Sequence, residues 1–285
     1  MDVSTVEADA EAEGIRRLLE AVYDRYGFDF RNYSYPSLKR RIGALIKDMR
    51  VSGVAELQRL LLEDSRQMER FLLKLSINTT SMFRDPGFYH VFRNHVVPHL
   101  KTHSFVRIWH AGCSTGEEVY SMAILLKEEG LYSRCRIYGT DMNEAVLSKC
   151  REGVFPLASM KEYTQNYNQA GGQRPFSEYY TACYDNAVLK PSLRDNVVFA
   201  QHNLVTDRSF NEFQVIFVRN VMIYFNRSLQ DSVHRLVLDS LCPTGFLALG
   251  TKESLHFAPC RAHYEELDAC HKIYRRKRLP CVRLS

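Results

Sequence analysis

The chain has 285 residues, enough for one large domain or for a smaller and a larger one. With 45% hydrophobic and 25% charged residues it has a globular composition, and no run of about 18 apolar residues predicts a membrane span. The net charge of +5 is mild. Its bases cluster at 38–50 and 271–283, a pattern that suits either nucleic acid or an acidic protein surface.

The first 14 residues contain five acids and no base, the opposite of a secretory or mitochondrial leader, and we expect a solvated tail there. Apolar residues then recur at helical spacing over 15–26 and 38–50, and 54–78 continues as one or two further helices. The spacing places four bases opposite the apolar stripe of the second helix, where a solvated face is the simplest interpretation. These bases are Lys39, Arg40, Lys47 and Arg50.

After residue 104 the pattern changes to short β-branched and aromatic runs that alternate with helical stretches, notably 117–129 and 227–241. Such alternation predicts an α/β domain with a mainly parallel sheet covered on both faces. The interval 155–192 is polar and turn-rich, and we expect an insertion with a small antiparallel hairpin. The predicted strands of the main sheet cover 105–109, 136–140, 196–200, 215–218 and 246–250.

The eight cysteines include no CxxC pair, and a chain of this size needs no disulfides, so we expect reduced thiols in a cytoplasm. His95, His99 and His103 are four residues apart, which could place three imidazoles on one helix face. Pro98 falls among them and no carboxylate or thiol joins the set, so we expect a wet surface rather than a metal site.

The stretch "HAGCSTGEE" (110–118) follows a predicted strand and opens a predicted helix, the place where α/β sheets bind nucleotides. Gly112 and its small neighbours let a ligand approach the backbone, yet the spacing is neither GxGxxG nor a P-loop. A phosphate would favour positive potential, whereas Glu117 and Glu118 place negative charge at the helix start. S-adenosylmethionine, with its ammonium, sulfonium and ribose diol, fits that charge. A glycine-rich turn whose acids interact with the helix dipole is the alternative.

Polar residues also follow the other predicted strands. Asp141 ends the second strand, where nucleoside-binding α/β folds grip a ribose diol, although "TDMNEAV" fits a capped helix start as well. "QHNL" (201–204) follows a third strand, and "VIFVRNVMIYFN" (215–226) brings Arg219, Asn220 and Tyr224 to the same sheet edge. At the junction of the helical part and the sheet, "SINTTSMFRDPGFY" (76–89) is either part of a site or a capped turn. Its polar residues include Asn78, Thr80 and Arg84.

In order along about 180 residues, these stretches read Asn-x-Thr-x-x-Phe-Arg-Asp, Gly-Cys-Ser-Thr-Gly-Glu-Glu, Thr-Asp, Asn-Leu, Arg-Asn-Val-Met-Ile-Tyr-Phe and "LALGTKESL". The series closely resembles the CheR-type chemotaxis receptor methyltransferases, which methylate glutamate side chains of bacterial chemoreceptors. The resemblance covers nearly the whole chain. It has three departures: His110 replaces a usual Ser, Val218 replaces a frequent Cys, and "GTKES" (250–254) replaces Gly-His-Ser-Glu-Ser.

The resemblance implies a Rossmann-like, S-adenosylmethionine-dependent methyltransferase that forms glutamyl methyl esters and S-adenosylhomocysteine. It also implies a helical N-terminal domain over 1–85, a catalytic domain over 86–285 and an inserted β-subdomain at about 155–192, which in some members tethers a receptor's C-terminal peptide. Arg84 and Tyr224 are the expected catalytic residues. The expected cofactor-binding residues are Asn78, Thr80, Arg84, Gly112, Glu118 (with Glu117 as the less favoured neighbour), Asp141, Asn203, Leu204, Arg219 and Asn220.

The resemblance further implies that the helix with Lys39, Arg40 and Arg41 docks on the methylation region of the receptor. The expected partners are thus the cytoplasmic helices of methyl-accepting chemotaxis receptors, without nucleic acid, membrane insertion or metal, and the default state is a monomer. Two alternatives stay open: an RNA or small-molecule methyltransferase on the same fold, and a non-catalytic receptor-binding module. The chain has no aromatic-interleaved basic groove that would favour RNA, and the missing GxGxxG disfavours an NAD-dependent oxidoreductase.

Overall fold

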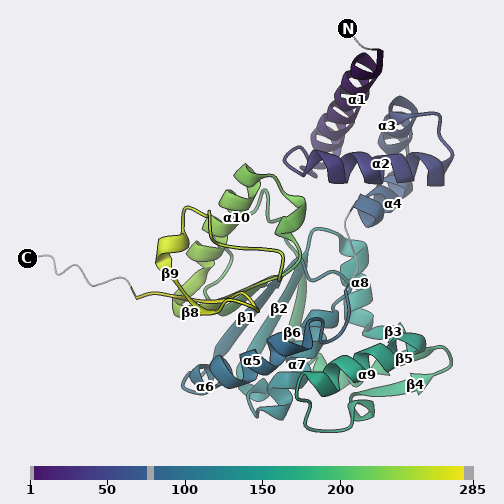
Figure 1. The fold of residues 1–285 in the computed structure, drawn as a ribbon. Coiled ribbons are helices and arrows are strands. Elements are labelled where there is room, and N and C mark those ends of the chain that lie inside the picture. Colours follow the sequence, from purple (N-terminus) through teal and green to yellow (C-terminus); the bar gives the residue numbers. More distant parts are fainter. Residues whose placement is uncertain (1–2, 76–79, 279–285) are drawn as a thin grey trace, which may run out of the picture. The chain divides into compact units, whose positions relative to one another are not determined.

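A computed structural model describes residues 3–75 and 80–278, with side chains from residue 9 onward. Within the chain, contacts define two compact units (Figure 1). One consists of Met1–Asn78 with Tyr224–Gln230, and the other of Thr79–Ile223 with Asp231–Ser285.

The N-terminal unit is helical, as expected, and buries apolar residues that recur at helical spacing, among them Leu18, Val22 and Leu45. Of the predicted helical stretch 54–78, residues 76–78 lie outside the described residues, and the rest forms two helices. The break between them is at Asp64, where the backbone is extended and the side-chain carboxylate accepts a hydrogen bond from the Arg66 amide. The helices are α1 (Val3–Tyr26), α2 (Tyr35–Met49), α3 (Val54–Glu63) and α4 (Ser65–Leu75).

The acidic N-terminal segment is not a solvated tail, and that prediction is wrong. Helix α1 already begins at Val3. The acids of this segment support the helix, since Glu13 pairs with Arg16 at 2.7 Å and Glu11 pairs with Lys39 of α2 at 2.6 Å. Its alanines and glutamates are strong helix formers, so helix propensity and ion pairs stabilise α1 in spite of the repulsion among its acidic residues.

The larger unit contains a seven-stranded sheet in the order β6-β2-β1-β7-β8-β10-β9. Neighbours from β6 to β8 pair in parallel, whereas β10 runs antiparallel to both β8 and β9. The five predicted strands are confirmed, and β9 and β10 were not predicted. The strands are β1 (Val106–Ala111), β2 (Cys135–Asp141), β6 (Val197–Gln201), β7 (Phe213–Val218), β8 (Leu241–Leu249), β9 (Tyr264–Asp268) and β10 (Ile273–Arg276).

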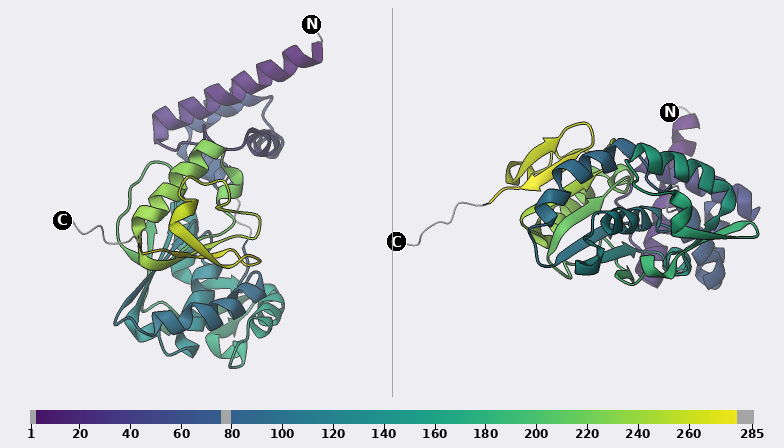
Figure 2. Two further views of the ribbon diagram at one scale, coloured as in Figure 1. Left: turned by 60° about the vertical axis from the view of Figure 1, so that its left-hand side comes forward. Right: turned by 90° about the horizontal axis from the view of Figure 1, so that it is seen from below.

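Helices cover both faces of this sheet, with α5 and α7 on one side and α10 on the other (Figures 1 and 2). The core between α5, α7 and the sheet is apolar and includes Phe88, Phe92 and Phe217, whose rings contact one another. The helices outside the insertion are α5 (Pro86–His95), α6 (Val97–Leu100), α7 (Glu117–Glu128), α8 (Glu144–Glu152) and α10 (Arg227–Ser240). None of the helices described is long and apolar enough to cross a bilayer.

The insertion contains the expected antiparallel hairpin, β4 (Tyr180–Cys183) with β5 (Asn186–Leu189), and β3 (Val154–Pro156) extends it to three strands. It also contains helix α9 (Met160–Gln169), which the polar, tyrosine-rich sequence did not predict. This helix buries Met160, Tyr163 and Tyr167 at helical spacing. Short 3-10 turns complete the chain at Tyr132–Arg134, Leu157–Ser159, Phe176–Tyr179, Pro191–Leu193, Met222–Tyr224 and Arg261–His263.

The strand order reverses at β1, because β2 and β6 lie on one side of it and β7 and β8 on the other. Open α/β sheets bind ligands outside the carboxyl ends of the strands at such a reversal. The topology therefore predicts a ligand site at the turns that follow β1 and β7.

Candidate active site

Four of the stretches singled out in the sequence follow strands at the carboxyl edge of the sheet. The turn 112–116 follows β1, Asp141 ends β2, the loop 202–212 follows β6, and Arg219 follows β7. Since these four strands are parallel neighbours, the loops lie along one edge.

Arg219 is the centre of a polar network at this edge. Its side chain is only 1% exposed, and it donates from Nη1 to Glu118 Oε2 and from Nη2 to Asp85 Oδ2, both at 2.8 Å. The other oxygen of Glu118 lies 2.9 Å from Nδ1 of His110, a fully buried residue of β1 whose ring stacks on Phe217. The network thus joins β1, β7, the start of α7 and the segment before α5.

Electrostatics hold this network in its charged form. Burial alone would raise the pKa of Glu118, but the Arg219 guanidinium and the hydrogen bond with His110 outweigh it and lower that pKa below its ordinary value. Burial would lower the pKa of Arg219, and its two carboxylate neighbours raise it instead. Glu118 is therefore an ionised carboxylate at neutral pH.

The turn after β1 is tightly folded. Gly112 has φ +73, and a Cβ there would lie 2.7 Å from Cγ2 of Val221, so the turn requires glycine. Asp141 connects the ends of β1 and β2, because its carboxylate accepts from the Ser114 amide and from the Asn143 amide, each at 3.0 Å. Burial raises the pKa of Asp141 in spite of these bonds. The capped helix start that "TDMNEAV" suggested is present, but its cap is Asn143, whose side chain accepts a hydrogen bond from the Ala145 amide.

The two adjacent glutamates have different surroundings. Glu117 is buried, accepts a hydrogen bond from the Thr115 hydroxyl at 2.7 Å and lies 3.4 Å from the Tyr163 hydroxyl of α9. Its pKa is raised by burial. Glu118, in contrast, contacts Arg219.

The segment before α5 brings the backbone of Arg84 to the network. Its carbonyl oxygen lies 3.5 Å from Nη2 of Arg219, and the Arg84 side chain is half-buried. Thr80 is also half-buried, and Asn78 lies outside the described residues.

The loop after β6 is organised by its own polar groups. Asn203 accepts a bond from the Val205 amide through Oδ1 and donates its own amide to Asp207, at 3.0 and 2.9 Å. The preceding amide, of His202, donates to the carbonyl of Asp141 at 3.1 Å, which brings this loop next to the end of β2. Leu204 is half-buried in the same loop.

Glu253 is a site residue that the sequence interpretation missed. Its Oε1 accepts from the amides of Val221 and Met222, and its Oε2 from those of Asn220 and Gly250, at 2.7 to 2.9 Å. The carboxylate is buried, which raises its pKa, and it fixes the turn that follows Arg219. Its place in "GTKES" was the available signal.

Tyr224 belongs to the N-terminal unit, where its ring lies 4.7 Å from the guanidinium carbon of Arg41. Arg41 is 9% exposed and donates to the carbonyl of Leu75 at the end of α4. Arg41, which the resemblance groups with Lys39 and Arg40 in the docking helix, therefore faces inward within its own unit. Lys39 and Arg40, by contrast, are exposed.

The residues at this edge fit S-adenosylmethionine. Two carboxylates flank one guanidinium, so the network favours additional positive charge, and Asp141 lies at the tip of the neighbouring strand. Within 3–75 and 80–278, Nε of Arg219 and Nε2 of His110 are buried without a hydrogen-bond partner, which leaves polar atoms for a ligand. Over the same residues, no group of three or more His, Cys, Asp or Glu could hold a metal ion.

Comparison with known proteins shows the family of the chain. Residues 78–269 match the CheR methyltransferase SAM-binding domain, and residues 13–76 match the CheR all-alpha domain. "Putative methyltransferase Cher3" of Pseudomonas putida is 48% identical over 95% of this chain and 99% of its own length. A chemotaxis protein methyltransferase of Salmonella typhimurium is 28% identical over 84% of this chain and 83% of that protein.

A solved structure, the N-methyltransferase NodS of Bradyrhizobium japonicum with S-adenosyl-L-homocysteine, overlaps with a TM-score of 0.36 at 11% identity. It covers 67% of this chain and 88% of that one, and the overlap is too loose to support a conclusion.

Proposed function

The chain belongs to the CheR methyltransferase family and is an S-adenosylmethionine-dependent methyltransferase, and from that premise we propose that its substrate is a glutamate side chain of a bacterial chemoreceptor. The methyl ester formed there would serve chemotaxis adaptation. The chemotaxis protein methyltransferases of Salmonella typhimurium and Pseudomonas aeruginosa, each 28% identical to this chain over 84% and 83% of its length, support a role in chemotaxis.

The observation that supports the cofactor part of the proposal is the acidic network at the carboxyl edge of β1 and β7. Asp85 and Glu118 both contact Arg219, so the group carries one more negative than positive charge when all three are ionised. Such a site disfavours a phosphate and favours the ammonium group of S-adenosylmethionine. We assign cofactor binding to Glu118 and Asp141, with Gly112, Asn203, Leu204 and Asn220 beside them.

The reaction needs no general base. A glutamate with a pKa of about 4.3 is already ionised at neutral pH, so its carboxylate oxygen can attack directly. The bound cofactor supplies a methyl group on a sulfonium. The new oxygen–carbon bond forms as the sulfur–carbon bond breaks, and the electron pair remains on sulfur as S-adenosylhomocysteine leaves.

The protein must align the two reactants and exclude water, which can lower the barrier by about 7–11 kcal/mol. We assign Arg84 to orient the incoming carboxylate, because a planar guanidinium matches two oxygens. We assign docking on the acidic methylation region of a receptor to the exposed Arg40 and to Lys39, which is exposed but paired with Glu11.

The proposal is tested by incubating the protein with methyl-labelled S-adenosylmethionine and membranes that carry chemoreceptors. We expect label in the receptor band and its release as volatile methanol in mild alkali, because methyl esters are cleaved under those conditions. Alkali-stable label on RNA or on a small molecule would contradict the proposal and support the alternative methyltransferase. Tight binding of S-adenosylhomocysteine without labelling of any receptor would support a non-catalytic module.

A further inference from the structure

Arg84 lies between two residues with a left-handed backbone. Phe83 has φ +52 and Asp85 has φ +57, and neither is glycine. Residues other than glycine rarely adopt this backbone conformation, so it persists only where surrounding contacts hold it. The position of Arg84 therefore depends on what holds residues 81–85.

Part of the restraint comes from the cofactor edge itself. The amide of Phe83 donates to Oγ of Ser121 on α7 at 2.9 Å, and Arg219 holds the Asp85 carboxylate. These contacts fix the two flanking residues from one side.

The remaining restraint comes from helix α9 of the insertion. Nδ2 of Asn166 donates to the carbonyl of Met82 at 3.1 Å and to Oγ of Ser81 at 3.3 Å. The next residue, Tyr167, packs its ring on that of the fully buried Phe83, with centroids 5.2 Å apart. The insertion thus contacts the backbone immediately before Arg84.

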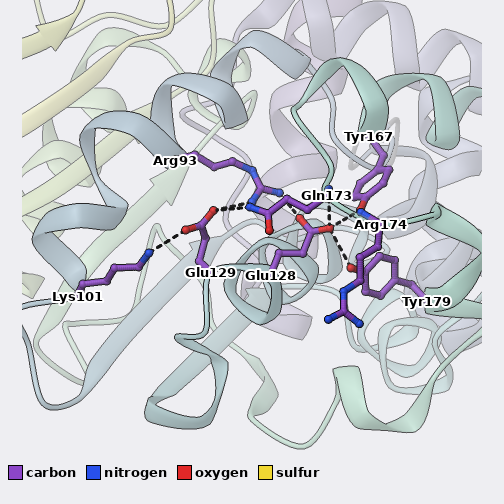
Figure 3. A network of polar contacts seen from close by, with 8 residues as sticks. All are labelled: Arg93, Lys101, Glu128, Glu129, Tyr167, Gln173, Arg174 and Tyr179. Atoms are coloured by element: carbon purple, nitrogen blue, oxygen red, sulfur yellow. Dashed lines mark hydrogen bonds and ion pairs between the residues drawn. The ribbon is translucent and has the colours of Figure 1, made fainter.

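Helix α9 is itself anchored to the sheet domain through Glu128 at the end of α7 (Figure 3). The Glu128 side chain is 1% exposed and pairs with Arg93 of α5. It also accepts from the hydroxyl of Tyr167 and, at 2.9 Å, from that of Tyr179. A carboxylate with several charge-assisted hydrogen bonds holds the insertion against α5 and α7, so α9 can restrain the backbone that it contacts.

We propose that Asn166 is a positioning residue for methyl transfer, which fixes Arg84 through the backbone of residues 81–85. The inference rests on the proposed function, since it assigns Arg84 to the reacting carboxylate. It makes the insertion part of the catalytic apparatus, whether or not the insertion also binds a receptor.

The test compares Asn166→Asp, which keeps the shape and loses the donor, with Asn166→Ala. Asn168→Asp is the matched control, because it makes the same change at an exposed position of α9. For each variant we would measure the affinity for S-adenosylhomocysteine by calorimetry, kcat and KM for methylation of receptor-bearing membranes, the melting temperature, and amide hydrogen exchange over residues 80–88.

We expect both Asn166 variants to lose about 10- to 100-fold in kcat, since small misplacements of a catalytic group cost that much. Amide exchange within 80–88 should rise about two- to tenfold, the equivalent of one lost hydrogen bond. Cofactor affinity should stay within about threefold, and Asn168→Asp should match the wild type.

Unchanged exchange within 80–88 would overturn the inference, as would equal losses in the Asn168 control. A parallel fall of melting temperature, affinity and kcat in both Asn166 variants would also overturn it, because Asn166 would then be merely structural. If the wild type methylates no receptor, the proposed function fails. The amide hydrogen exchange of residues 80–88 then still decides whether Asn166 fixes residues 81–85.

Discussion

At the scale of single residues, the site is defined by how charges are shared. Arg219 is almost fully buried and bonds to two carboxylates, and Glu118 shares its two oxygens between Arg219 and His110. Such a group is stable because every charge has a partner within 3 Å, and removal of Glu118 would leave Arg219 with one carboxylate in place of two.

Glu118→Gln should therefore destabilise the protein in a pH-dependent way. At pH 7 we expect a loss of about 1–3 kcal/mol in the free energy of unfolding, the cost of a hydrogen bond to a charged group. The pKa of Glu118 is lowered by folding, so its contribution is present above the ordinary value of 4.5 and is lost as the pH falls through the lower pKa of the folded state. Urea unfolding of both proteins from pH 7 to pH 3 measures this, and a difference that does not shrink in acid would refute it.

Arg84→Ala should separate binding from chemistry. Because we assign its guanidinium to the incoming carboxylate, we expect turnover to fall about 100-fold, with affinity for S-adenosylhomocysteine within about threefold of the wild type. Steady-state kinetics with calorimetry checks this. If affinity collapses together with turnover, Arg84 is a cofactor-binding residue and its assigned role is wrong.

At the scale of elements, turns rather than strands carry the site. The turn after β7 is held by Glu253, which accepts from three amides of that turn and from the amide of Gly250, just after β8. The sequence pattern identifies "RNVMIYF" as a functional turn, but it does not identify the distant carboxylate that shapes it.

Glu253→Gln should loosen this turn. In the glutamine variant the side-chain NH2 group replaces one carboxylate oxygen, and it would face two backbone N–H donors. We therefore expect the free energy of unfolding to fall by about 1–3 kcal/mol and S-adenosylhomocysteine to bind more weakly. Glu152→Gln, an exposed change of the same kind, should have little effect on either. Urea unfolding and calorimetry test both variants. Equal unfolding free energies and equal affinities for S-adenosylhomocysteine would contradict the role of Glu253 in fixing the turn.

Helix α2 offers a second matched pair, in neighbouring arginines with opposite surroundings. Arg41→Ala removes a donor to the Leu75 carbonyl and a contact with the Tyr224 ring, so we expect a loss of about 2–4 kcal/mol in the free energy of unfolding. Arg40→Ala removes an exposed charge and should stay within about 0.5 kcal/mol. Its effect should instead be a higher KM for receptor. A stable Arg41→Ala protein would show that the buried arginine is dispensable.

At the scale of the whole molecule, the parallel strands and the helical N-terminal unit were predictable because hydrophobic periodicity and burial agree there. The antiparallel strand β10 was not, because its basic residues resemble a solvated tail. In the fold Arg275 lies over the Phe246 ring and Arg276 donates to the carbonyls of Leu238 and Leu241. Arg41 and helix α9 were missed for a related reason, since their polar groups are satisfied by partners distant in sequence.

The sequence indicates which strands end at the candidate site. The Arg219 network could not be read from the sequence, because Asp85 and Arg219 lie far in sequence from each other and from the stretch that contains His110 and Glu118. Only the fold brings them within hydrogen-bond distance.

The most direct test of the account is to map the methyl group on the receptor. Purified receptor would be incubated with S-adenosylmethionine and either the wild-type protein or Arg84→Ala, then digested and sequenced by mass spectrometry. We expect a methyl ester on glutamate side chains of the receptor's cytoplasmic helices, formed much more slowly by the variant. A methyl group on a nitrogen or on another residue type, or none on any receptor tested, would contradict it.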